Sequence, residues 1–260
     1  GVQPAQLTEA FFKLGVTYDE VGQSFGVYKV YVNGHTFDFS FPRSETKTGQ
    51  GYRGFDVYID PFLSPEMAAS RRDLTMNAIM YDLKENKYFD FFGGVRDIIQ
   101  GVMRPTTKAF KEDPLRVLRA FQFGSRFGFK ASDQLARYCL ELLSEKNTLT
   151  PERVWVEWEK WATKSRFPSM GIDFLTWVLW AETEITNLIG VQQDPTHHPE
   201  GDAFIHTLRV VDAAKEICNR ERLNEDETII LMLAALCHDF GKANTTFFHE
   251  KKQKWVAYNH

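Results

Sequence analysis

The sequence has few cysteines and no long apolar run, and both absences limit what the protein can be. Its 260 residues include three cysteines, Cys139, Cys218 and Cys237, none of them in a CxxC pair. Three thiols cannot all pair, so we expect reduced thiols in a cytoplasmic protein rather than a disulfide framework. No apolar run approaches the ~18 residues that a membrane helix needs, and no signal peptide is visible, so we expect no membrane partner.

An excess of basic charge is also missing. The formal net charge is −4 and the isoelectric point is about 6.0. No global field therefore attracts nucleic acid, and any RNA binding must rest on local groups of Lys and Arg. The chain has no internal repeat and no low-complexity tract, and its length suggests about two compact units.

Hydrophobic patterning changes near residue 105, from a mixed α/β region to an all-α region. The Asn33-Gly34 pair between two alternating runs is the strongest short hairpin signal. Five tryptophans in the helical region are interpreted as core. The main predicted elements are a helix over 4–14, strands near 27–32 and 35–41, a polar mobile loop over 45–54, a helical pattern from Ser64 with Leu74, Ala78 and Tyr81 on one face, and helical stretches over 113–126, 131–185, 203–222 and 225–237.

Two polar clusters carry residue types that suit nucleotide binding. In RRDLTMNA (71–78), Arg71 and Arg72 could clamp triphosphate oxygens with forked donors. Asp73 and Asn77 are four apart on the predicted helix, so they share a face that could hold ribose hydroxyls and orient the arginines. The alternative interpretation is a solvated, charged helix start.

In EDPLRVLRA (112–120), Asp113 and Arg116 are expected three apart on one helix face. A carboxylate accepts from the exocyclic amine of C or A, and a guanidinium donates to the adjacent ring nitrogen. G and U present mismatched groups there, and mismatched buried polar groups reject a substrate strongly. The alternative is a simple intrahelical salt bridge.

A third cluster has the residue types of a metal site. His206 lies in one predicted helix, and the adjacent His238-Asp239 pair ends another. Imidazole and carboxylate ligands suit transition metals that activate water. The alternative is a buried core histidine. Further candidates around this cluster are Lys242 for a substrate phosphate, His260 and less strongly His249 as ligands, and His197 and His198, which either line the mouth of the site or shape a turn.

Together these clusters, with HTFDFSFPRSETKTGQGYRGF (35–55), resemble class II tRNA nucleotidyltransferases and bacterial poly(A) polymerases, and the H…HD pattern resembles the HD superfamily. The resemblance covers essentially the whole chain in order. It implies an α+β fold: a polymerase-β-like nucleotidyltransferase head with an antiparallel or mixed sheet, then an all-α neck and body, then a helical HD domain. The implied boundaries are 1–104, 105–190 and 191–260.

The same resemblance implies an enzyme that uses CTP, ATP and Mg²⁺ on the 3′ end of tRNA. Glu112 and Arg119 would orient the selecting pair, and Asp38 matches an acidic strand position near the metal-binding carboxylates, although an ordinary exposed strand residue is equally compatible. His206, His238 and Asp239 would bind Ni²⁺, Mn²⁺ or a similar ion for phosphohydrolysis.

Some of the family pattern is missing. No Asp-x-Asp pair precedes the first strand, and GGVRD (93–97) is interpreted as a structural turn rather than a phosphate loop. We therefore expect a chain truncated at both ends. The alternatives are an HD phosphohydrolase with an inactive head, a poly(A) polymerase-like enzyme, and a non-catalytic tRNA-binding protein.

Overall fold

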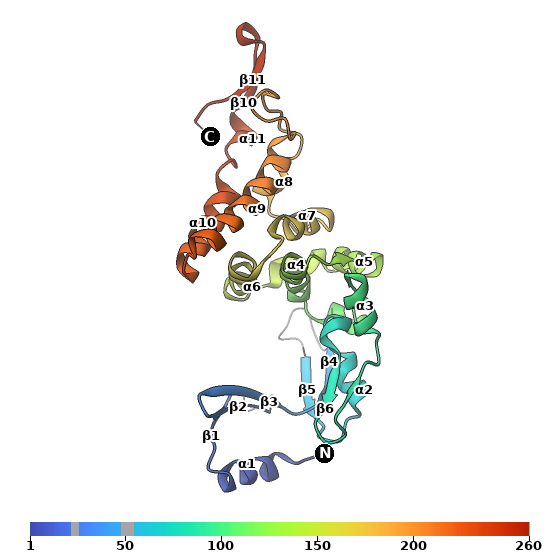
Figure 1. Cartoon of the computed structure of the whole chain (residues 1–260). Helices are drawn as coiled ribbons and strands as arrows, with labels where there is room; N and C mark the ends of the chain where they lie inside the picture. The colour runs from blue at the N-terminus through green and yellow to red at the C-terminus, as the bar shows by residue number, and fades with distance from the viewer. Residues whose placement is uncertain (22–25, 48–54, 260) are drawn as a thin grey trace. The chain divides into compact units, whose positions relative to one another are not determined.

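The structure is a computed structural model that describes residues 1–21, 26–47 and 55–259, without the side chains of residues 44–47 and 55–57. The chain forms two compact units, one made of residues 1–95 and 106–113 and the other of residues 96–105 and 114–260 (Figure 1). Within the described residues, no helix is both long enough and apolar enough to span a bilayer.

The first unit begins with a helix and a three-stranded antiparallel sheet of order β1-β2-β3. Asn33 and Gly34 both have positive φ, 50° and 79°, which is the tight turn that their pairing predicts. Helix α1 packs its Phe11 ring against Tyr28 of the sheet, where Phe11, Tyr28, Val30 and Phe41 form a small core. The elements are α1 (Pro4–Lys13), β1 (Thr17–Glu20), β2 (Val27–Val32) and β3 (His35–Ser40).

A second antiparallel pair follows, made of β4 (Arg43–Lys47) and β5 (Phe55–Ile59). The prediction of a loop over 45–54 is therefore wrong for residues 45–47, which pair with the strand that starts at Phe55. Backbone pairing overrides their polar composition because ladder hydrogen bonds depend on the main chain. Residues 48–54 lie outside the described part of the chain.

The helix predicted from Ser64 onward is much shorter than its pattern suggested. Helix α2 (Pro65–Ser70) ends at the Arg71 cap, and a single 3₁₀ turn (Thr75–Asn77) follows. Asp73 accepts a hydrogen bond from the backbone N–H of Leu74 at 2.8 Å, a local bond that competes with helix continuation. Leu74 and Ala78 are buried as predicted, whereas Tyr81 is exposed. The hairpin of β6 (Met80–Asp82) and β7 (Lys87–Phe89) completes this region.

The second unit is mainly helical, as the sequence predicted. Helix α4 packs against α6 and α7, and α9 packs against α7 and α10 (Figure 1). At Gly171 of α7 a Cβ would lie 1.9 Å from Ser125 Oγ, so the missing side chain allows α4 and α7 to approach closely. The helices are α3 (Gly94–Gln100, which begins at the end of the first unit), α4 (Leu115–Phe127), α5 (Asp133–Glu141), α6 (Pro151–Lys164), α7 (Pro168–Trp177), α8 (Thr183–Thr186), α9 (Ala203–Glu221), α10 (Glu225–Cys237) and α11 (Lys242–Thr245).

Two features of this unit differ from the all-α prediction. Short strands are present: β8 (Val102–Met103) pairs with β9 (Lys130–Ala131), and β10 (Thr246–His249) pairs with β11 (Lys254–Ala257). The tryptophans are also not uniformly core. Trp161 and Trp180 are fully buried, but Trp155 on α6 and Trp177 on α7 are 46% and 54% exposed.

Candidate functional site

The predicted histidine–aspartate cluster forms where two packed helices meet. His206 lies on the first turn of α9, and His238 and Asp239 follow directly after α10. Asp202 starts α9 by accepting a hydrogen bond from the Ile205 N–H at 2.9 Å, which fixes where His206 projects. The three side chains offer ligand atoms that all lie within 4.8 Å of one another. The structure therefore brings together the three residues predicted as metal ligands.

The Nδ1 atom of each histidine ring already has a hydrogen-bond partner. His206 Nδ1 lies 2.6 Å from Glu200 Oε1, and His238 Nδ1 lies 2.8 Å from the Ala235 carbonyl oxygen. Carboxylate and carbonyl oxygens only accept, so each neutral ring carries its proton on Nδ1 and its lone pair on Nε2.

Both lone pairs point towards the same carboxylate. The Nε2 atoms of His206 and His238 lie 3.8 and 3.2 Å from Asp239 Oδ2. Two neutral imidazole nitrogens and one carboxylate oxygen form a donor set that suits a divalent transition metal. The residues present therefore fit the ion that the sequence predicts.

Lys242 lies beside this cluster but is held by protein oxygens. Its Nζ is 2.8 Å from Asp239 Oδ2 and donates to Gln193 Oε1, also at 2.8 Å. The side chain is buried, so its charge acts on the Asp239 carboxylate more strongly than it would in water. In this structure Lys242 is thus a partner of Asp239, while the predicted contact with a substrate phosphate stays a prediction.

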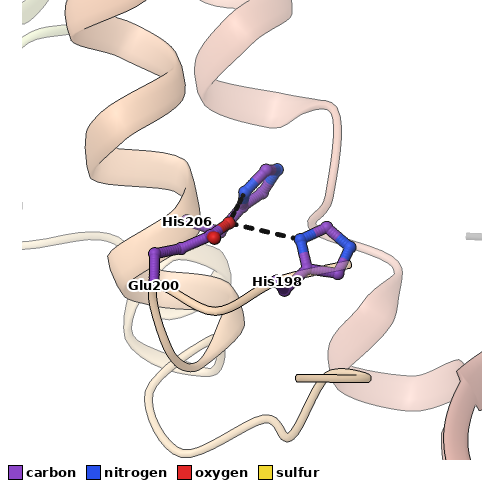
Figure 2. A group of neighbouring side chains, drawn as sticks. All are labelled: His198, Glu200 and His206. Atoms are coloured by element: carbon purple, nitrogen blue, oxygen red, sulfur yellow. Dashed lines mark hydrogen bonds and ion pairs between the residues drawn. The ribbon is translucent and has the colours of Figure 1, made fainter. Parts of the chain in front are cut away.

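Sequence reasoning missed Glu200, which binds two histidines (Figure 2). Its Oε1 lies 2.6 Å from His206 Nδ1 and 3.3 Å from His198 Nδ1. A hydrogen bond from its own backbone N–H, and then the one from His206, lower the pKa of the Glu200 carboxyl from 4.5 to about 2. Glu200 is therefore ionised at neutral pH. Glu200 lies in a loop, where no helical or strand periodicity marks a residue as facing the site. The one available signal was that it is an acidic residue six positions before the candidate ligand His206.

The other histidines near the cluster have different positions. His197 and His198 line a cleft of about 320 Å³ together with Lys242 and Trp255, and their backbone N–H groups donate to the Asp194 carbonyl in a turn, so both interpretations offered for them stay open. His249 ends β10 and is not among the grouped ligand residues of the described chain. His260 lies outside the described residues.

In the first unit, Asp73 and Asn77 do bind one another, but not on a shared helix. Asn77 Nδ2 donates to Asp73 Oδ1 at 3.0 Å across the 3₁₀ turn. Asp73 is buried, Arg71 is half-buried and Arg72 is exposed. The expected helix face is therefore wrong, whereas the expected proximity of the carboxylate and the amide is confirmed.

The residues just before Glu112 and Asp113 are hydrogen-bonded to the arginine-rich segment. Thr107 Oγ1 donates to the Ser70 carbonyl at 2.7 Å, and the Thr106 N–H donates to the Asp73 carbonyl at 3.1 Å. These bonds tie the residues leading to Glu112 and Asp113 to the arginine-rich segment within one compact unit.

Asp113 itself is not helical, which corrects the prediction of a helix over 113–126. Its backbone is extended, with φ −132° and ψ 112°, and α4 begins at Leu115. Pro114 explains the difference because proline disfavours the helical region for the residue before it. Arg116 and Arg119 are half-buried in the first turns of α4, and the Arg119 guanidinium lies 5.4 Å from the centre of the Phe123 ring.

The last two sequence candidates have clear environments. Asp38 lies on exposed strand β3 opposite Lys29, which is compatible with either a catalytic or an ordinary strand position. In GGVRD, the N–H groups of Gly94 and Val95 donate to Asp90 at 2.7 and 2.9 Å, so a protein carboxylate already occupies the start of α3. A structural role for this segment is therefore supported, as a helix start rather than a simple turn.

Two known domain families match separate parts of this chain. The Poly A polymerase head domain family matches residues 1–104, and the HD domain family matches residues 203–260. The Multifunctional CCA protein of Pasteurella multocida is 38% identical over 88% of this chain and 54% of its own length. That of Actinobacillus pleuropneumoniae is 37% identical over 94% of this chain and 58% of its own length. The chain thus spans just over half the length of these curated relatives.

Solved structures show the same fold at lower identity. A tRNA nucleotidyltransferase complexed with a primer tRNA and an incoming ATP analogue covers 91% of this chain and 64% of its own chain, with 21% identity and a TM-score of 0.62. Fold and site thus define a nucleotidyltransferase head joined through helices to an HD domain, two domain types that use divalent metals. The chain is similar to class II tRNA nucleotidyltransferases with an HD domain, and the curated relatives it matches are multifunctional CCA proteins.

Proposed function

We propose that this chain is the part of a tRNA nucleotidyltransferase that binds CTP and ATP for addition or repair of the 3′-terminal CCA, together with an HD phosphohydrolase. The observation that carries the proposal is the presence of both family domains in one chain whose relatives match about nine tenths of it. Primer tRNA and an ATP analogue in a solved neighbour of similar fold support tRNA and ATP as ligands.

Nucleotide binding is assigned to the arginine-rich segment. The guanidinium groups of Arg71 and Arg72 would bind the triphosphate, since forked donors match phosphate oxygens. Asp73 is buried and bonded to Asn77. These two side chains would bind the ribose hydroxyls and orient the two arginines. A side chain fixed by its neighbour loses less conformational entropy when the nucleotide binds.

Base selection is assigned to Asp113 and Arg116. The carboxylate would accept from the exocyclic amine of C or A while the guanidinium donates to the ring nitrogen, so G and U leave both protein groups mismatched. Asp113 has an extended backbone, and Arg116 lies in the first turn of α4. Glu112 and Arg119 would orient the pair.

Mg²⁺ belongs to the polymerase part of the proposal, where two ions align the 3′ hydroxyl with the α-phosphate. Asp38 would be an auxiliary carboxylate. In the described part of the first unit, no group of three potential ligands lies close together. Apart from Asp38, the residues assigned in this unit have proposed roles in binding and selection of the nucleotide.

The HD part is assigned to His206, His238 and Asp239, which would hold a divalent transition metal such as Ni²⁺ or Mn²⁺. The ion would supply an activated water for phosphoester hydrolysis. The Ala235 carbonyl would keep the proton of the His238 ring on Nδ1, and Lys242 would offset the charge of Asp239.

The test is nucleotide addition by the complete gene product to a tRNA that lacks its three terminal nucleotides. The proposal predicts incorporation of C, C and then A when CTP and ATP are supplied, and none from UTP or GTP. Addition of A alone would indicate a poly(A) polymerase-like enzyme. Hydrolysis of 2′,3′-cyclic nucleotides without addition would leave the HD activity only, and tRNA binding in a gel shift with neither activity would indicate a binding protein.

A further inference from the structure

The two histidines of the proposed metal site are held in different ways. The His238 ring is anchored by a carbonyl of its own helix, three residues earlier at Ala235. The corresponding carbonyl for His206 is that of Ala203, which accepts the Thr207 hydroxyl at 2.8 Å. His206 instead donates to Glu200, a side chain from the loop before α9 (Figure 2). Of these two rings, His206 is the one whose Nδ1 is held by a side chain rather than by the backbone.

The geometry at Glu200 is that of a strong, directed hydrogen bond. The 2.6 Å separation between His206 Nδ1 and Glu200 Oε1 is short for a nitrogen–oxygen pair and typical of a charge-assisted bond. The side chain of Glu200 is 12% exposed, so little water competes for the carboxylate. This bond opposes rotation of the ring and favours the orientation in which Nε2 lies 3.8 Å from Asp239 Oδ2.

We propose that Glu200 is a positioning residue of the HD site, which fixes the tautomer and orientation of His206 so that its Nε2 is available to the metal. The inference rests on the proposed function, because it assumes that His206, His238 and Asp239 bind an ion. Metal-bound histidines generally depend on such a partner, and its loss typically weakens metal affinity 10–100-fold.

A rival arrangement uses the same residues differently. His198, Glu200 and His206 also offer ligand atoms within 4.8 Å of one another and could hold an ion themselves. In that set His206 faces Glu200 through its Nδ1, and a proton on that nitrogen would leave no lone pair there for an ion. His198 Nδ1 is also more distant from Glu200 Oε1, at 3.3 Å. His198 therefore distinguishes the two arrangements.

The experiment measures Mn²⁺ binding to the complete gene product by the loss of the free-ion signal in electron paramagnetic resonance. Asp239→Ala defines the part of the binding that belongs to the HD site. Glu200→Ala should weaken that part about 10–100-fold, and Glu200→Gln, which keeps an acceptor oxygen, should weaken it less. His198→Ala should change it less than about 3-fold. Glu221→Ala, the same substitution at an exposed position of α9, is the matched control and should leave it unchanged.

A second measurement determines the tautomer of the His206 ring directly. Long-range ¹H–¹⁵N spectra of ¹⁵N-histidine protein distinguish an Nδ1–H ring from an Nε2–H ring. The His206 signal, assigned with His206→Gln, should be of the Nδ1–H type in the parent protein and in Glu200→Gln, and should become a mixture of the two tautomers in Glu200→Ala.

The outcomes separate the inference from the proposal beneath it. Unchanged Mn²⁺ binding in Asp239→Ala would overturn the metal site and the Glu200 role together. Loss in Asp239→Ala with parent-like binding and a parent-like tautomer in Glu200→Ala would overturn the Glu200 role alone. An equal loss in His198→Ala and Glu200→Ala would show that the ion lies in the rival set.

Discussion

Replacing Lys215 with methionine should destabilise the helical unit by about 3 kcal/mol without changing its fold. Lys215 lies on α9 with 7% of its surface exposed, and its Nζ donates to the carbonyls of Ala162 and Thr163 at 3.0 and 2.8 Å. These carbonyls belong to the last turn of α6, where helix backbone acceptors lack internal partners and favour a cation. Methionine keeps most of the packing volume and removes both bonds.

The magnitude follows from opposing contributions. A hydrogen bond from a charged donor contributes about 1.5–3 kcal/mol, and two are lost together with the interaction between the charge and the helix end. Part of this is recovered because methionine avoids the desolvation of a buried ammonium. A net loss of about 3 kcal/mol is a large share of the stability of an ordinary domain.

Urea unfolding followed by tryptophan fluorescence measures this loss in the relevant unit. All six tryptophans lie between residues 155 and 255, so the signal reports the second unit and not the first. Lys215→Arg should lose less than the methionine variant because it keeps donors, and Lys251→Met, at an exposed position, should match the parent protein. A midpoint for Lys215→Met within error of the parent would refute the assigned role of the two carbonyl bonds.

The pH dependence of the free energy of unfolding tests the burial of Lys215 independently. Burial lowers the pKa of Lys215 below its ordinary value of 10.5. The unfolded chain therefore binds more protons than the folded chain between the lowered pKa and 10.5, and the free energy of unfolding rises with pH in that window. The stability advantage of the parent over Lys215→Met should accordingly increase as pH rises towards 10.5. A decrease over the same range would contradict burial as the cause.

Two further substitutions test one residue in each compact unit. His238→Ala should abolish metal-dependent phosphohydrolysis and leave CCA addition intact; loss of both activities would mean that the histidine–aspartate pair is structural. Gly94→Ala should destabilise the first unit by about 1–3 kcal/mol, because its Cβ would lie 2.3 Å from the Thr75 carbonyl oxygen and the surrounding backbone would have to shift. Thermal melting followed by circular dichroism checks the second prediction, and an unchanged melting temperature would show that the backbone adapts without cost.

Several secondary-structure elements that are determined by residues adjacent in the sequence were predicted correctly. The Asn33-Gly34 turn and its strands were predictable because two residues that tolerate positive φ, between alternating runs, define a hairpin without reference to the rest of the chain. Helices α9 and α10 were predictable for the same reason, since an Asp202 or Asn224 cap precedes each apolar pattern. The three proposed metal ligands were predicted from the H…HD pattern, and they lie on α9 or directly after α10.

Features that depend on competition or on distant partners were not predictable in the same way. Apolar spacing after Ser64 suited a long helix, but α2 ends at Ser70, and the Asp73 carboxylate accepts from the Leu74 backbone N–H beyond that end. Pro114 should have excluded Asp113 from the following helix, and the rule was available but outweighed by the charge spacing. Glu200 reaches His206 through an irregular loop whose course is set by turns at Asp194 and Asp202, and no spacing rule describes it.

The most direct test of the central claim is single-nucleotide incorporation by the complete gene product on a tRNA that lacks its CCA end, with each of the four nucleoside triphosphates supplied in turn. The parent protein should use CTP and ATP and reject UTP and GTP. Arg116→Ala and Asp113→Ala should lose much of this discrimination and keep tRNA binding, whereas Arg126→Ala, a control in the last turn of α4, should keep both. Full selectivity in Arg116→Ala or Asp113→Ala would contradict the assignment of base selection, and no incorporation by the parent protein would contradict the proposed function itself.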